Sequence, residues 1–175
     1  MYWRHRSYKL YDELFQVIKH RKGIDAYTLF VHHLKPALYV YPRDKGYYEL
    51  KKQGFPFIQL RNNSRVFVQT EKQKASVEKK IRREDETRTP YYSDKLGVIL
   101  GYPEVAVQDF INRSPRMPQD KRVFIKYHGI TFVVHEDNIY KALKDIKNRI
   151  PIPPFFNSYV YAYKKIYQQV IPIPL

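Results

Sequence analysis

Lysines recur near the C-terminal end of the chain at a spacing that would align their charges. Lys141, Lys144 and Lys147 follow one another in steps of three residues. On a helix, this spacing places side chains along one side. Ammonium groups in such a row bind phosphates, and aromatic rings between cations can stack on bases. The row therefore indicates binding of nucleic acid through its phosphates, with little sequence specificity.

Similar charges occur on a second predicted helix, residues 71–86, and on two predicted hairpins. Helix 71–86 also carries several acids, so an ordinary solvated helix face is the favoured interpretation there. On the helix that begins at residue 137 the cations form a cleaner stripe. The candidate phosphate-binding residues are Arg61, Arg65, Lys79, Lys80, Arg82, Arg83, Lys121, Arg122, Lys126, Lys141, Lys144 and Lys147.

The charge excess belongs to the whole chain. The 175 residues include 32 Lys+Arg against 17 Asp+Glu, a formal net charge of +15. An excess of this size points to an anionic partner. Positive residues outnumber acids in every part of the sequence, so a basic arm is disfavoured. Folding must gather any binding face from several elements.

Other kinds of chemistry find less support. The chain has no cysteine, which excludes disulfides, thiolate nucleophiles and cysteine-bound zinc. His20, His32 and His33 lie near acids in sequence, yet no metal-ligand spacing such as H-E-x-x-H is present, so no metal site is predicted. His135 and Glu136 are expected at the surface. Without a nucleophile motif or a glycine-rich loop, no cofactor is predicted and an enzyme is the less favoured class.

Two alternatives to nucleic-acid binding stay open. One is a protein-interaction module, such as a viral or plasmid accessory factor. The other is a metal-dependent nuclease, which needs clustered carboxylates that only the fold could bring together. A charged surface that serves thermal stability alone would need no anionic partner.

The order of predicted elements indicates an α+β fold with antiparallel pairing. Hairpins are expected near 57–70 and 122–135, packed with five to six helices. Helices are expected at 7–21, 47–53, 71–86, 94–113 with a break at 101–103, 137–149 capped by Asp137, and in a last segment after 157. Residues 37–41 predict a strand. Residues 25–34 fit either a helix capped by Asp25 or a strand.

The segment from Leu96 to Phe110, with Gly101, Tyr102 and Pro103 at its centre, is similar to part of an uncharacterised archaeal protein family. In that family the segment runs roughly LGxLLGYP, one residue, CC, V, two residues, F. Val105 and Ala106 stand here in place of the two cysteines. The resemblance implies no activity, and the residues themselves predict a packed corner between two helices. A DNA-reading helix-turn-helix is the alternative, which Glu104 and Asp109 on the second helix disfavour.

Length and composition suggest a single domain over residues 1–175. The aromatic segment 155–175 is expected to dock on the protein's own core, and self-association or a protein partner is the alternative. No signal peptide and no membrane span is predicted, which favours the cytoplasm, or the host cytoplasm for a viral protein. The composition resembles that of hyperthermophilic archaea and their viruses.

Overall fold

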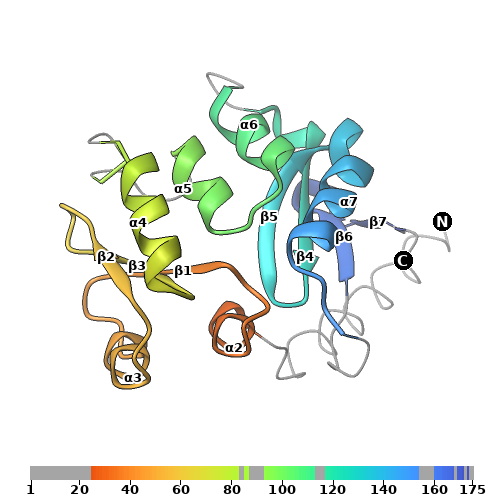
Figure 1. Ribbon diagram of the computed structural model, residues 1–175. Helices are drawn as coiled ribbons and strands as arrows, with labels where there is room; N and C mark the ends of the chain where they lie inside the picture. The colour runs from red at the N-terminus through yellow and green to blue at the C-terminus, as the bar shows by residue number, and fades with distance from the viewer. Residues whose placement is uncertain are drawn as a thin grey trace, which may run out of the picture.

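Two small antiparallel sheets organise the fold (Figure 1). The computed structural model describes residues 25–82, 85–86, 93–112, 117–153, 160–167, 169–171 and 173, so the helix predicted at 7–21 lies outside these residues. The three-stranded sheet, in the order β1-β3-β2, consists of β1 (Ala37–Val40), β2 (Phe57–Gln59) and β3 (Arg65–Val68). The four-stranded sheet, in the order β5-β4-β6-β7, consists of β4 (Arg122–Tyr127), β5 (Ile130–His135), β6 (Val160–Lys164) and β7 (Gln169–Ile171).

The helices of the described residues lie between and around these strands. The α-helices are α2 (Ala26–Val31), α3 (Gly46–Lys52), α4 (Glu71–Lys80), α5 (Asp94–Ile99), α6 (Glu104–Asn112) and α7 (Ile139–Arg149). Short 3-10 turns are η2 (Gln119–Lys121), η3 (Glu136–Asn138) and η4 (Lys165–Tyr167). The predicted α+β fold and both predicted hairpins are confirmed. None of the described helices is long and apolar enough to cross a membrane.

The three-stranded sheet is covered on both faces. Side chains alternate along a strand, so Phe67 packs with Phe30 of α2 and Leu50 of α3, while Val66 and Val68 face the other way. The second face packs against α4 and α5 (Figure 1). This is why β3 is an almost continuous apolar run, which is typical of a strand buried on both sides.

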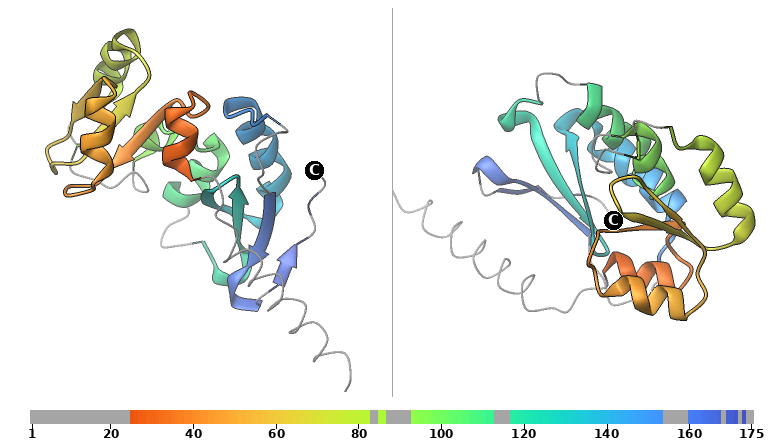
Figure 2. Two further views of the ribbon diagram at one scale, coloured as in Figure 1. Left: turned by 90° about the horizontal axis from the view of Figure 1, so that it is seen from below. Right: turned by 90° about the vertical axis from the view of Figure 1, so that its left-hand side faces the viewer.

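The four-stranded sheet forms the second half of the molecule, which Figure 2 (left) separates clearly from the first. Its inner face, with Val123, Ile125 and Val134, packs against the apolar stripe of α7. Ala142 and Ile146 belong to that stripe and are fully buried. Burial of one side of α7 leaves its other side to solvent.

The corner between α5 and α6 joins the two halves. A Cβ atom on Gly97 of α5 would lie 2.7 Å from Cγ2 of Val107 on α6, so only glycine lets the two helices approach this closely. Gly101 has a φ of +88°, the left-handed conformation that ends many helices. The predicted break between the two helices is confirmed at this point.

Three sequence predictions about elements are wrong. The helix predicted at 71–86 ends at Lys80, because Ile81 is extended and the main-chain N–H of Arg82 donates to the buried carboxylate of Asp85. The last segment forms β6 and β7 rather than a helix, because β6 pairs with β4. Asp137 does not cap α7, which begins after η3 with Asn138 as its N-cap residue.

Candidate nucleic-acid interface

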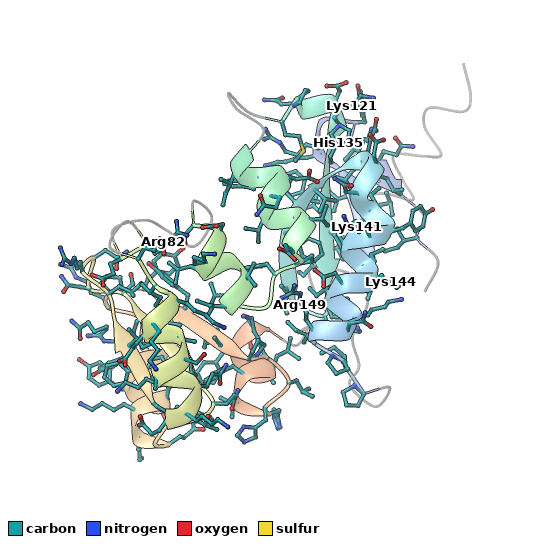
Figure 3. The ribbon with its side chains drawn as sticks, turned by 45° about the horizontal axis from the view of Figure 1, so that its top comes forward. Arg82, Lys121, His135, Lys141, Lys144 and Arg149 are labelled. Carbon is teal, nitrogen blue, oxygen red and sulfur yellow. The ribbon has the colours of Figure 1, made fainter. Side chains whose placement is uncertain are left out.

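The exposed side of α7 carries three lysines. Lys141, Lys144 and Lys147 lie opposite the buried stripe of Ala142 and Ile146, and all three are exposed. Figure 3 shows Lys141 and Lys144 on the same helix. Among the described residues, no ion pair involves any of the three. Their charge is therefore available to an anion from solution.

Two carboxylates beside α7, those of Glu104 and Asp145, are engaged within the protein. Asp145 accepts a hydrogen bond from Nε of Arg149 at 2.8 Å through Oδ1 and one from the main-chain N–H of Glu104 at 2.8 Å through Oδ2. The Arg149 guanidinium also lies 3.9 Å from the Glu104 carboxylate. A groove of about 480 Å³ between α6 and α7 lies beside these groups and is lined in part by Lys141 and Lys144. Glu104 and Asp145 together leave one negative charge after Arg149 is counted, and Lys141 and Lys144 make the groove positive overall.

Tyr140 adds an aromatic ring to this face. Tyr140 is 64% exposed, and among the exposed large apolar residues that the structure describes only Tyr48 is more exposed. Lys144 follows one helical turn later, at the i,i+4 spacing that makes side chains neighbours. Sequence reasoning missed Tyr140, although its place outside the apolar stripe of α7 was a signal that could have revealed it. We name Tyr140, Lys141, Lys144 and Lys147 together the α7 face.

Four other candidate cations are engaged within the protein. Nε of Arg61 lies 2.8 Å from Glu86, and Lys121 pairs with Glu136. The Arg65 guanidinium lies 3.7 Å above the ring of Tyr47, in cation–π geometry. Arg122 donates through Nη2 to the carbonyl of Met117 at 2.8 Å. These contacts reduce what each of the four can offer a phosphate.

The remaining candidates lie elsewhere. Lys79, Lys80 and Arg82 are exposed at the end of α4, in the other half of the molecule, and Figure 3 shows Arg82 well separated from Lys141 and Lys144. Lys126 lies on the outer face of the four-stranded sheet, and Arg83 lies outside the described residues. The fold therefore does not gather the twelve predicted residues on one surface.

His135 is buried, contrary to the sequence prediction. Only 9% of it is exposed. Its main-chain N–H donates to Oδ2 of Asp109 at 2.9 Å, and its Nδ1 lies 3.2 Å from a carboxylate oxygen of Asp137. Asp109 also accepts hydrogen bonds from the Asn138 side chain. On α6, Asp109 therefore faces inward and supports the start of α7, while Glu104 stays 68% exposed.

No metal-binding cluster is found in the part of the chain that the structure describes. No group of three or more His, Asp or Glu side chains there could hold a metal ion. His20 and its neighbouring acids lie outside these residues. His32 and His33 are both exposed, and His33 hydrogen-bonds through Nδ1 to Gln69 at 2.6 Å.

Five titrating groups of the described residues have shifted pKa values, and the shifts of Glu136 and Lys35 are large. Hydrogen bonds from Lys121 and Lys164 hold the pKa of Glu136 at about 2. Burial lowers the pKa of Lys35 to about 7. The Lys35 side chain is 3% exposed and donates to the carbonyl oxygens of Ala37 and Leu100, so it links β1 to the end of α5. Both groups hold elements of the fold together.

Comparison of the chain with protein-family models, curated proteins and solved structures found no significant match.

Proposed function

We propose that this protein binds nucleic acid through phosphate contacts made by the α7 face, with little sequence specificity. The observation that carries the proposal is the row of three exposed lysines that no described acid neutralises, beside an exposed tyrosine. Lys141 and Lys147 are six residues apart, which a rise of 1.5 Å per residue converts to about 9 Å along the helix axis. Such a row can follow successive phosphates of one strand.

The mechanism is release of counterions. A nucleic acid holds a condensed layer of cations, and each lysine that contacts a phosphate frees part of that layer. The gain is entropic and independent of base sequence. Tyr140 offers a flat ring on which a base can stack, a contact that every base can make because each has a π-face. An unpaired strand exposes its bases, so Tyr140 favours single-stranded nucleic acid over duplex.

A salt titration tests this proposal. Fluorescence anisotropy of a labelled single strand of mixed sequence, and of its duplex, is measured between 50 and 200 mM salt. We expect binding at low salt, a linear fall of log K with log salt, and tighter binding of the single strand. Absence of binding at low salt, or binding indifferent to salt, would refute the proposal.

A cytoplasmic location and a role for 155–175 in self-association stay predictions.

A further inference from the structure

Strand β5 has one side without a neighbouring strand. In the four-stranded sheet it pairs with β4 alone and forms the edge. The two-residue turn at His128 and Gly129 makes Tyr127 and Ile130 the closing pair. Main-chain groups alternate in direction along an antiparallel strand, so those of residues 131, 133 and 135 point away from β4. The hydrogen bond from the His135 N–H to Asp109 confirms this direction.

The outward main-chain groups of Thr131 and Val133, unlike the N–H of His135, have no hydrogen-bond partner among the described residues. Within the described residues, no hydrogen bond reaches the outward N–H and C=O groups of these two residues. Thr131 is exposed. Asp109 closes the edge at His135, so the open part is short. An edge of this kind is a template on which another extended chain can form hydrogen bonds.

An apolar cavity adjoins the open edge. Its volume is about 200 Å³, and its walls come from α5, α6 and the sheet. Val107 and Phe110 of α6 line it, together with Phe124 and Phe132 of the sheet. No charged side chain is found among its described lining residues. A chain that paired with β5 could therefore place an apolar side chain here.

Positive charge borders the same edge on the outer face of the sheet. Residues opposite each other in an antiparallel pair share a face, so Lys126 lies beside Thr131 and Arg122 beside His135. No described acid forms an ion pair with Lys126. A second copy of this chain, itself carrying +15, would bring like charges together at this edge. An acidic partner would instead be attracted.

We propose that the β5 edge binds an extended, acidic peptide segment of a partner protein by strand addition. The peptide residue opposite Phe132 is apolar and enters the cavity, because side chains at that position point to the inner side of the sheet. The peptide residue opposite Thr131 is acidic, since it points to the outer face beside Lys126, whereas the residue opposite Val133 lies beside Phe124. The recognised pattern is thus an acidic residue next to an apolar one. This surface is separate from the α7 face, and the proposal does not rest on nucleic-acid binding.

The first experiment uses a synthetic peptide and the full chain. The probe is a fluorescein-labelled Gly-Glu-Val-Glu-Val-Glu-Gly peptide, and the control has lysine in place of each glutamate. Two further peptides carry N-methyl groups on one or the other set of alternate amides. We expect anisotropy to show binding of the acidic peptide, no binding of the lysine peptide, and a loss of about tenfold or more for only one methylated set. Equal effects of both sets, or equal binding of the lysine peptide, would overturn the proposal.

A protein variant tests the same edge from the other side. Thr131→Pro removes the outward N–H and leaves the bonds to β4 in place, and edge strands accept proline. We expect peptide affinity to fall about tenfold or more, while the control Thr131→Val binds as the wild type does. Circular dichroism checks that both variants fold, and if Thr131→Pro does not fold, the methylated peptides decide. Dimerisation that Thr131→Pro abolishes, or displacement of the peptide by an oligonucleotide, would assign the edge to another occupant and overturn the proposal.

Discussion

Removal of the lysines of the α7 face should change the salt dependence of nucleic-acid binding by a calculable amount. The change is the triple substitution of Lys141, Lys144 and Lys147 by glutamine. All three side chains are exposed and none has an ion-pair partner among the described residues, so the fold should lose little stability. The slope of log K against log salt changes by roughly 0.7 per phosphate contact for a single strand and 0.9 for duplex.

Three contacts therefore account for a slope of about 2 on a single strand and nearly 3 on duplex. Between 50 and 200 mM salt, these slopes correspond to roughly 20-fold and 40-fold losses of affinity. The triple variant should lack that part of the salt dependence. The assay is fluorescence anisotropy of the same labelled strands at four salt concentrations, with urea denaturation to confirm that the variant is folded.

A matched variant separates contact from net charge. Lys72, Lys79 and Lys80 of α4 are also exposed, and their replacement by glutamine removes the same three charges from the other half of the molecule. We expect this control to keep nearly the whole wild-type slope. An equal fall in slope for both variants would mean that binding follows overall charge, and an unchanged slope in the α7 variant would refute the assignment to α7.

Further predictions concern single residues. Tyr140→Ala should weaken single-strand binding by about 1–3 kcal/mol in anisotropy and leave the salt slope unchanged, because stacking is lost and phosphate contacts stay. The unfolding free energy of the wild type should rise between pH 7 and pH 10.5, by at most about 5 kcal/mol. The reason is that over this range Lys35 keeps its proton only in the unfolded chain. In urea titrations, Lys35→Met should flatten this rise. The pKa of Glu136 lies near 2, below its ordinary 4.5, so the ion pairs of Glu136 stabilise the fold above pH 4.5 and are lost as the pH falls toward 2. On acidification, Glu136→Gln should therefore lose less stability than the wild type. Circular dichroism at a series of pH values measures this difference. Gly97→Ala should destabilise the fold by about 1–3 kcal/mol, with partial recovery in the double variant with Val107→Ala, because the new Cβ would meet Val107 at 2.7 Å.

Local patterns predicted the elements whose signals lie close together in sequence. The helix at α7, the hairpin at 122–135 and the break at 101–103 all depend on short-range features, and each is confirmed. The segment at 160–171 was mispredicted because Tyr163, Tyr167 and Val170 lie at helical spacing, while Tyr161 and Tyr163 also alternate as in a strand. Pairing of β6 with β4, which is distant in sequence, decides between them.

The candidate site was predictable only in part, for a similar reason. The lysine spacing on α7 identified three residues of the site, whereas the engagement of Arg61 by Glu86 and of Arg122 by Met117 depends on how the chain folds back. Burial of His135 requires Asp109 of α6, and burial of Lys35 requires the carbonyl of Leu100. Contacts between distant residues of this kind leave no local pattern.

The net charge of a protein indicates how strongly it attracts an anionic partner only when the cations already paired within the protein are left out of the count. In this chain Arg61, Lys121, Arg149 and Lys164 hold acids of their own, and Lys35 is buried with its amine bound to carbonyls. Among the predicted phosphate-binding residues that the structure describes, those without such contacts are Lys126 on the four-stranded sheet and two sets of cations, one at the end of α4 and one on the α7 face. The two sets differ in their neighbours, since α4 carries Glu71 and Glu78, whereas the acids beside α7 are bound to Arg149 and to a main-chain N–H. An anion should therefore bind at α7 in preference to α4, although both helices carry several lysines.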